Sequence, residues 1–474
     1  MNTVRRTLAS TKTRSIFRQW ENFLQISNQN SNLLRFSVTS TCNNVRFDDH
    51  IAVYKNRSTA ELLRNIAVLK VCSFDVFVDN SLQLMNIGQK SLGRHFFRFI
   101  MKYTFYSQFV AGENSEEILT SAEKLISSNI YSLPTAMLEE NELFTDGNST
   151  KRFEANLDVI KDCVEIGDRI TSSEKFKMCH FKFTGLMPYT LMVKLTEIYE
   201  NSNNKQEMVR KISESMLSGK KIYFEELSKS QNDELNDAVV RLGITGQISA
   251  AKKVKILIDA EYVNTNPAIS LLCVAMMVAF NKQKVLIHNT YQCYLKTTTK
   301  TVIEDKTIAE NLGSGFGAKV VRGAYIHIEK ERAQKQGYED PICESLEKTS
   351  EQYDGVIKML LERVKEKPEQ TGLVIATHNE TSVLRAMDQL NKLDISTKKG
   401  NAVFAQILGI GDHITYSLAD KGYIVYKSIP YGPMEELLPY LSRRAMENKA
   451  IMRGAIKERN MVMQELKRRL YFKS

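Results

Sequence analysis

The chain has 474 residues, of which 25% are charged and 43% hydrophobic, a composition typical of a folded globular protein with a large core. It contains no run of about eighteen apolar residues, so the sequence predicts no membrane-spanning helix. The seven cysteines include no C-x-x-C pair and the seven histidines no H-E-x-x-H motif, so we predict neither a redox dithiol nor a metal site.

The first twenty residues are basic and rich in serine and threonine. No acid precedes Glu21, and the basic side chains are Arg5, Arg6, Lys12, Arg14 and Arg18. This composition is typical of a mitochondrial transit peptide, with a disordered basic tail as the alternative. Residues 21–58 are polar, so we interpret residues 1–58 as a transit peptide and flexible link. Because half of the net charge of +10 lies in the leader, the remaining chain is only mildly basic, which argues against nucleic-acid binding.

Helical spacing of apolar residues dominates the next part of the chain. Residues 59–104 show this pattern and are predicted to form N-terminal helices that pack on a main domain over 105–474. Residues 113–175 and 190–250 are also helical in pattern. The longest apolar run, residues 268–280, is too short to span a membrane and predicts a buried helix.

Eight short, apolar and β-branched runs end in a polar residue or a glycine. They are residues 105–113, 177–185, 254–261, 284–292, 318–325, 372–379, 401–409 and 423–432. Most are apolar through their middle, as expected for parallel strands buried on both faces. The later runs alternate with helical segments, which predicts an α/β fold, specifically a (β/α)8 barrel.

Polar side chains gather at the carboxyl ends of these predicted strands. The residues concerned are Lys182, Asp259, Glu261, Asn289, Gln292, Arg322, Tyr325, Thr377, His378, Gln406 and Ser428. The carboxyl ends of barrel strands meet at one rim, where such enzymes build their active sites. The pattern therefore predicts a ring of hydrogen-bonding groups around a ligand.

Two further motifs need interpretation. The sequence GSGFG at residues 313–317 precedes a predicted strand instead of following one, so it is not a dinucleotide-binding fingerprint and predicts a helix stop and loop. The segment PYLSRRAMEN at 439–448 places a tyrosine, two arginines and a glutamate on one side of a helix, at about 100° per residue. Taken alone, this segment favours a solvent-exposed helix that carries an Arg–Glu pair.

The segments IDAEY, VVRGAY, ATHN and YGPMEELLPYLSRRAMEN occur in this order and resemble the proline dehydrogenase family. The resemblance runs from about residue 105 to residue 469. It implies a distorted TIM-like (β/α)8 barrel that holds FAD at its carboxyl rim without a Rossmann fold. It also implies that proline is oxidised to pyrroline-5-carboxylate, with hydride passing from C5 to flavin N5. Electrons then pass to ubiquinone through peripheral contact with the mitochondrial inner membrane, on the matrix side.

The resemblance also implies roles for individual residues. Arg443 and Arg444 match a clamp for the substrate carboxylate, since a guanidinium binds that group bidentately. The other residues that match substrate-binding positions are Lys182, Tyr325, Tyr440 and Glu447. Lys182, Asp259, Lys319 and the two arginines are the implied catalytic set. The implied cofactor contacts are Ala260, Asn289, Lys319, Arg322, Gly323, Ala324, Thr377 and His378.

Ser428 stands where proline-oxidising members of the family generally carry a tyrosine over the substrate ring. A serine leaves room at C4 and can hydrogen-bond a 4-hydroxyl group. This position and the surrounding GYIVYKSIPYG resemble the hydroxyproline dehydrogenase branch, which implies trans-4-hydroxy-L-proline as main substrate and proline as a poorer one. The alternatives are a dehydrogenase that prefers L-proline, a non-flavin barrel enzyme that binds anions, and a membrane-surface scaffold without catalysis.

Overall fold

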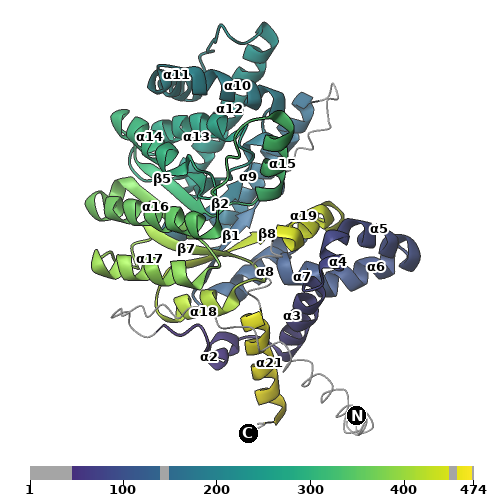
Figure 1. Cartoon of the computed structure of the whole chain (residues 1–474). Helices are drawn as coiled ribbons and strands as arrows, with labels where there is room; N and C mark the ends of the chain where they lie inside the picture. Colours follow the sequence, from purple (N-terminus) through teal and green to yellow (C-terminus); the bar gives the residue numbers. More distant parts are fainter. Residues whose placement is uncertain (1–44, 139–148, 448–455, 472–474) are drawn as a thin grey trace. The chain divides into compact units, whose positions relative to one another are not determined.

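The computed structural model describes residues 45–138, 149–447 and 456–471. Within them, eight parallel strands form a closed barrel in chain order (Figure 1). The strands are β1 (Ile130–Thr135), β2 (Met178–Phe181), β3 (Lys255–Ile258), β4 (Ile287–Gln292), β5 (Phe316–Val321), β6 (Thr371–Ala376), β7 (Ala402–Ile407) and β8 (Val425–Pro430). Closure joins β8 to β1 in the register Ile130↔Val425 to Thr135↔Pro430. The predicted α/β barrel is confirmed.

Helices surround the barrel between the strands. They are α8 (Ser115–Ile126), α9 (Ser149–Arg169), α10 (Tyr189–Asn201), α11 (Lys205–Ser218), α12 (Lys229–Lys252), α13 (Asn266–Phe280), α14 (Thr298–Asn311), α15 (Ile326–Gln336), α16 (Leu346–Glu366), α17 (Glu380–Lys392), α18 (Asp412–Asp420) and α19 (Met434–Glu447). Helix α13 contains the long apolar run and is buried over nearly its whole length, because α10, α11 and α12 cover it. No helix of the described segments is long and apolar enough to cross a bilayer.

Successive side chains along each strand point alternately outward, toward the helices, and inward, into the barrel, so the strands contribute to two apolar layers. On β5, Phe316, Ala318 and Val320 belong to the main core beneath the helices, whereas Lys319 lies on the inner face. Inside the barrel, Leu257, Val374 and Tyr426 belong to a second, smaller cluster contributed by several strands. Polar inner-face residues near the carboxyl ends of the strands are therefore held by a rigid, packed scaffold.

The predicted first strand is wrong. Residues 105–109 continue a helical segment, with η3 at Lys102–Tyr106 and α7 at Ser107–Phe109, residues 110–113 form no strand, and β1 lies later in the chain at Ile130–Thr135. Short aromatic runs suit a buried helix as well as a strand. Tyr106 and Phe109 are buried because they join a cluster with α19.

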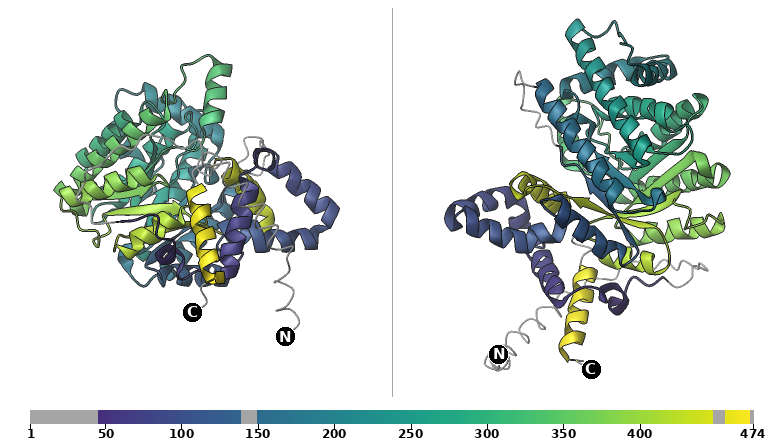
Figure 2. Two further views of the ribbon diagram at one scale, coloured as in Figure 1. Left: turned by 60° about the horizontal axis from the view of Figure 1, so that its bottom comes forward. Right: turned by 180° about the vertical axis from the view of Figure 1, so that it is seen from behind.

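The N-terminal helices begin earlier than predicted. They are α2 (His50–Tyr54), α3 (Thr59–Cys72), α4 (Asp75–Asp79), α5 (Ser81–Leu92) and α6 (Arg94–Met101). Asp49 caps α2, and Phe47, Val53 and Tyr54 enter the main core, so the predicted flexible link does not extend to residue 58. Figure 2 shows α4, α5 and α6 beside α19, and the C-terminal helix α21 (Ile456–Tyr471) packs on α3.

Candidate active site

Five polar side chains meet on the inner face of the barrel at the carboxyl ends of its strands. They are Thr135 of β1, His180 of β2, Asp259 after β3, Lys319 of β5 and Ser428 of β8. The ammonium of Lys319 forms an ion pair with Asp259. His180 Nδ1 lies 3.1 Å from Asp259 Oδ2, and His180 Nε2 lies 2.9 Å from Ser428 Oγ. The hydroxyl of Thr135 contacts His180 Nε2 and lies 3.2 Å from Ser428 Oγ, which completes a continuous chain of polar contacts.

The charge on Asp259 fixes the direction of these hydrogen bonds. Burial alone would raise the pKa of Asp259, but Lys319 and His180 together hold it well below its usual range. An ionised carboxylate only accepts hydrogen bonds, so His180 Nδ1 donates to Asp259. In the neutral ring Nε2 is then an acceptor, which turns the hydroxyl hydrogen of a neighbouring serine or threonine toward it. Through His180, the Ser428 hydroxyl on β8 is thus connected to the ion pair of Asp259 and Lys319.

The sequence analysis missed His180 and Thr135. Alternation in the segment KMCHFKF places His180 on the same face as Lys182, two residues later, so a signal for His180 existed. Thr135 gave no signal because its strand was not predicted. Thr135 and His180 are register partners across β1 and β2, which explains why their side chains touch.

Lys182 follows β2 and is half-buried near a second carboxyl group. Burial raises the pKa of Glu261, while the positive charge of Lys182 and hydrogen bonds from Thr184 oppose that rise. The Thr184 hydroxyl donates to Glu261 Oε2 at 2.8 Å. Lys182 after β2 and Glu261 after β3 therefore carry charges of opposite sign that interact near the ends of adjacent strands.

Arg322, directly after β5, has neutral hydrogen-bonding partners in the described part of the chain. Its guanidinium donates to Thr377 Oγ1 at 2.7 Å and to Ser382 Oγ at 2.9 Å, and it lies 4.5 Å from the centre of the Tyr353 ring. These contacts orient the guanidinium without neutralising it. A fixed, uncompensated cation of this kind suits an anionic ligand such as a pyrophosphate.

The residues after Arg322 make a tight backbone turn. Gly323 has φ +137°, and a Cβ at this position would lie 1.4 Å from a ring carbon of Tyr294, so only glycine fits. Ala324 is exposed. Tyr325 follows, half-buried, with its ring centre 4.7 Å from that of Tyr262.

Thr377 and His378 connect the ends of neighbouring strands. The Thr377 hydroxyl accepts from Arg322 and from the backbone N–H of Asn379. His378 Nε2 accepts from the backbone N–H of Ile407, at 3.3 Å, and so links β6 to the end of β7. Ala260 lies half-buried directly after Asp259.

Asn289 lies on the face opposite to the one we expected. Its amide donates to Ser270 Oγ at 2.9 Å and lies 3.5 Å from Asp305 Oδ2, so it points into the helix layer and not toward the barrel interior. The neighbouring Thr290 and Gln292 occupy the other face of β4. β4 is buried on both faces, and its apolar pattern therefore gave no indication of which residues face inward.

The double-arginine segment is helical, as predicted. Helix α19 runs from Met434 to Glu447, and Tyr440 on it is half-buried. The side chains of Arg443, Arg444 and Glu447 lie outside the described residues. Their roles in holding a carboxylate remain predictions.

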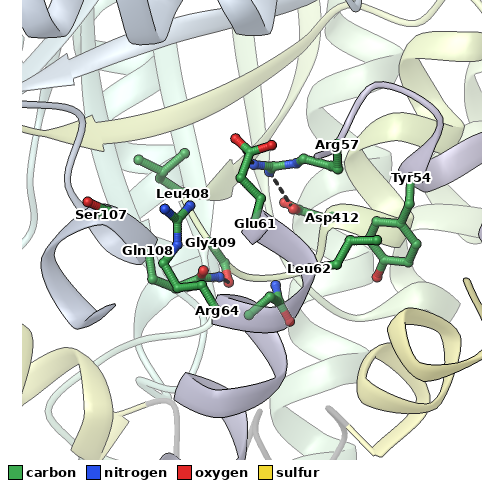
Figure 3. A pocket seen from close by; sticks show the side chains of 11 residues that line it. Tyr54, Arg57, Glu61, Leu62, Arg64, Ser107, Gln108, Leu408, Gly409 and Asp412 are labelled. Atoms are coloured by element: carbon green, nitrogen blue, oxygen red, sulfur yellow. Dashed lines mark hydrogen bonds and ion pairs between the residues drawn. The ribbon is translucent and has the colours of Figure 1, made fainter. Parts of the chain in front are cut away.

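A small cavity under the loop after β7 is too small for a substrate. It measures about 30 Å³ and is lined by residues of α3, α7 and this loop, among them Glu61, Gln108 and Gly409 (Figure 3). That volume accommodates one or two water molecules. At its edge Arg57 donates to Asp412 Oδ2 at 2.6 Å, and Lys427 Nζ lies 2.9 Å from Asp412 Oδ1. This buried ionic cluster supports the loop after β7 beside Ser428.

Comparison with known proteins identifies the family. The family model described as proline dehydrogenase matches residues 121–455. The chain belongs to the proline dehydrogenase family. It is 36% identical to a hydroxyproline dehydrogenase of Xenopus laevis, over 88% of this chain and 89% of that protein. It is 34% identical to the Homo sapiens hydroxyproline dehydrogenase, over 87% of this chain and 91% of that protein.

Proline dehydrogenases are more distant relatives. Proline dehydrogenase 1, mitochondrial, of Drosophila melanogaster is 28% identical, over 90% of this chain and 81% of that protein. A crystal structure of proline utilization A from Bdellovibrio bacteriovorus shares the fold, with a TM-score of 0.59 and 17% identity. That match covers 86% of this chain but only 39% of the longer bacterial protein.

The donor set of this family member fits a flavin dinucleotide. Arg322, directly after β5, offers an oriented cation held by hydroxyl groups, and Lys319 offers a second cation on the inner face of β5. Anionic phosphates suit the first position. A cation near an aromatic ring that gains negative charge suits the second.

Proposed function

We propose that the protein is a FAD-dependent dehydrogenase of trans-4-hydroxy-L-proline that also oxidises L-proline more weakly, and that its product is the corresponding pyrroline-5-carboxylate. The observation that supports this substrate is the environment of Ser428. Its hydroxyl lies on the inner face of β8, within hydrogen-bonding distance of Thr135 and His180, and Ser428 is partly exposed. The names of the hydroxyproline dehydrogenases at 33–36% identity agree with this choice.

Several residues would bind and orient the substrate. Arg443 and Arg444 would hold the substrate carboxylate, with Glu447 orienting one guanidinium and Lys182 contributing a further positive charge. Such positioning can lower the activation barrier of the reaction by several kcal/mol, and by about 7 kcal/mol or more where the reacting groups are well aligned. Tyr325 and Tyr440 would form walls of the pocket.

Ser428 would bind the 4-hydroxyl of the substrate. Where the Ser428 hydroxyl donates to His180 Nε2, its oxygen would be turned to accept a hydrogen bond from the substrate hydroxyl. A site built to pair with a hydroxyl discriminates against an analogue that lacks it, because a buried polar group is then left unpaired. Proline would therefore bind and react, but less well.

The proposed cofactor contacts follow from the two cations Lys319, on β5, and Arg322, directly after it. Arg322 would bind the FAD pyrophosphate, with Gly323, Ala324, Thr377, His378 and Ala260 as neighbouring contacts. Lys319, held by Asp259, would lie against the flavin ring. When bound, FAD would accept the hydride that leaves substrate C5, while the ring nitrogen loses a proton.

Location and electron acceptor belong to the same proposal. Related proline dehydrogenases from Drosophila melanogaster, Caenorhabditis elegans and Dictyostelium discoideum carry the word mitochondrial in their names. The basic leader of this chain agrees with import into mitochondria. Ubiquinone, reached from the matrix side of the inner membrane, would take the electrons.

A change of Ser428 to tyrosine tests the substrate. The ring would fill the space at C4, so the ratio of kcat/KM for hydroxyproline over proline is expected to fall at least tenfold, which is about 1.4 kcal/mol. Ser428→Ala is the matched control, since it removes the hydroxyl but leaves the space. If the tyrosine variant keeps the wild-type ratio, the protein is better described as a proline dehydrogenase, the alternative function.

A further inference from the structure

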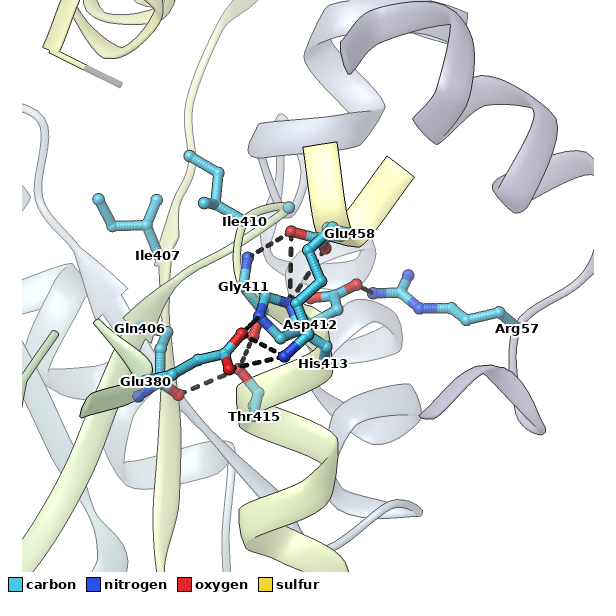
Figure 4. A network of polar contacts seen from close by, with 12 residues as sticks. Arg57, Glu380, Gln406, Ile407, Ile410, Gly411, Asp412, His413, Thr415 and Glu458 are labelled. Atoms are coloured by element: carbon cyan, nitrogen blue, oxygen red, sulfur yellow. Dashed lines mark hydrogen bonds and ion pairs between the residues drawn. The ribbon is translucent and has the colours of Figure 1, made fainter. Parts of the chain in front are cut away.

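Lys427 on β8 is a fully buried lysine whose ammonium group binds a single short loop. This loop, residues 407–412, begins at the last residue of β7 and ends at the first residue of α18 (Figure 4). Lys427 Nζ donates to the backbone oxygens of Ile407 and Ile410, at 3.1 and 2.6 Å, and lies 2.9 Å from Asp412 Oδ1. An ammonium group has three donors, so the loop takes up its whole hydrogen-bonding capacity.

Lys427 itself lies on the outer face of the barrel. The neighbouring side chains are on the inner face, with Tyr426 in the cluster inside the barrel and the Ser428 hydroxyl beside His180. Because successive side chains of a strand alternate, Lys427 points into the helix layer, where Asp412 at the start of α18 pairs with it. Any influence of Lys427 on a ligand inside the barrel must therefore pass through the loop that it holds.

The first part of this loop is bonded to the backbone of Ser428. The N–H of Leu408 donates to the backbone oxygen of Ser428 at 3.0 Å, and Ile407 is the register partner of Ser428 across β7 and β8. The Ser428 side chain is the group that we propose to pair with the 4-hydroxyl of the substrate. A shift of the loop would therefore move the backbone that carries this hydroxyl.

The apolar side chains of the same loop meet α19. Ile410 is only 3% exposed and belongs to one apolar cluster with Leu437 and Leu441 of that helix. Ile407 packs against the same cluster. These two isoleucines are the residues whose backbone oxygens Lys427 binds. α19 is also the helix that carries the two arginines proposed to hold the substrate carboxylate.

Other parts of the fold hold the remainder of the loop. Glu458 of α21 accepts from the backbone N–H groups of Gly411 and Asp412, at 3.0 and 3.2 Å. Gln108 of α7 donates to the backbone oxygen of Gly409 at 3.1 Å. Removal of the buried ammonium should therefore loosen the two isoleucines while the rest of the loop stays attached.

We propose that Lys427 is a positioning residue that sets the spacing between Ser428 and α19. Through one loop it fixes the backbone of the hydroxyl-binding serine at one end of the site and the helix of the carboxylate clamp at the other. A substrate with both a carboxylate and a 4-hydroxyl must fit the two ends at once, so its binding depends on this spacing. The identity of the two substrate groups rests on the proposed function, whereas the connection between the two ends is made by the bonds of the loop.

Lys427→Met tests this role, because methionine keeps most of the buried volume and removes all three donors. With a water-soluble electron-accepting dye, KM for hydroxyproline should rise about tenfold and KM for proline about threefold, while each kcat changes less than about threefold. Contacts with the carboxylate and the 4-hydroxyl are made in the ground state as well as in the transition state, so their loss raises KM more than it lowers kcat. Proline loses less because it has no 4-hydroxyl.

Lys177→Met is the matched control for the loss of a buried ammonium. Lys177 directly precedes β2, at the opposite end of the barrel, and its ammonium lies 2.6 Å from Asp168 Oδ1. This variant also loses an ion pair but leaves the loop after β7 untouched, so both KM values should stay at those of the wild type.

Ile410→Val tests the same connection without changing a buried charge or a hydrogen bond. It removes one methyl group from the cluster with α19 and should raise KM for both substrates about threefold. Ile414→Val is its matched control, because Ile414 is fully buried on α18 in the main core and loses the same methyl group. That variant should keep the wild-type KM values.

Amide hydrogen exchange of α19 provides a measurement that does not depend on turnover. The backbone amides of Met434–Glu447 should exchange at least about threefold faster in Ile410→Val than in Ile414→Val. They should also exchange faster in Lys427→Met than in Lys177→Met. Differences confined to α18, with α19 unchanged, would show that the loop does not position the clamp helix.

The outcomes separate the positioning role from the proposed function. A folded Lys427→Met with wild-type KM values would overturn the role, and so would an equal rise of KM in Lys177→Met. If Lys427→Met does not fold, the two valine variants decide, and equal KM values together with equal exchange of α19 would overturn the role. A wild type that oxidises neither imino acid with the dye would refute the proposed function, and the exchange of α19 would then decide the positioning role by itself.

Discussion

Replacing His180 with asparagine should reduce the preference for hydroxyproline. The bond between His180 Nε2 and Ser428 Oγ is 2.9 Å long and lies in a site where His180 is only 7% exposed. A hydrogen bond there contributes ~0.5–1.5 kcal/mol net, and a buried hydroxyl left without its partner costs somewhat more. Asparagine is too short to bridge Asp259 and Ser428 together. We therefore expect a loss of about 1.5 kcal/mol in binding the 4-hydroxyl, or roughly tenfold in kcat/KM for hydroxyproline.

The quantity that decides between these outcomes is kcat/KM for hydroxyproline divided by kcat/KM for proline. Steady-state turnover with a water-soluble dye would give kcat/KM for hydroxyproline and for proline in the wild type and in His180→Asn. Proline has no 4-hydroxyl, so its kcat/KM should fall far less, by about twofold. Thr135→Val serves as a control that removes a neighbouring hydroxyl but leaves the bond from His180 to Asp259 in place. Equal losses for both substrates would refute the reasoning, because they would show that His180 acts only through Asp259 and the fold.

The remaining predictions concern the ionic groups that support the rim. Lys427 is fully buried against Asp412, so Lys427→Met should lower the free energy of unfolding by about 3–5 kcal/mol in a urea titration, and a loss below about 1 kcal/mol would contradict it. Burial lowers the pKa of His413, but Glu380 and Glu458 outweigh burial and raise it to about 9 (Figure 4). Because folding raises the pKa of His413, the protonated ring stabilises the folded state. This contribution is fully present when the pH is below the unfolded pKa of 6.5, and it is lost as the pH rises through about 9. Unfolding followed from pH 6 to 10 should show this loss in the wild type, whereas His413→Gln should lack that slope.

The barrel was predictable because its strands carry a local signal. Seven of the runs identified in the sequence coincide with β2–β8, since each is apolar in the middle and ends in polar residues at the rim. β1 was missed because Ser132 and Pro134 interrupt its apolar pattern, and a proline is rare inside a central strand. Both strands beside β1 are parallel to it and distant in sequence, so only the closed barrel reveals that this segment is a strand.

The position of a site residue was predictable only where the sequence shows which face of its strand the side chain occupies. Lys182 and Asp259 lie at the strand ends where they were expected, and Lys319, which only the family resemblance singled out, lies within β5 and meets Asp259. Asn289 was assigned to the wrong face because a doubly buried strand has no polar side to set its register. His180 was not singled out, although it shares a face with Lys182 two residues later.

The most direct test of the central claim is the rate at which bound flavin is reduced by each imino acid. The purified protein would be mixed without oxygen with trans-4-hydroxy-L-proline or with L-proline, and bleaching of the yellow flavin would be followed by stopped flow. We predict that hydroxyproline bleaches the flavin faster than proline does. A correctly folded protein that binds no flavin, or one that proline reduces as fast as hydroxyproline, would contradict the account.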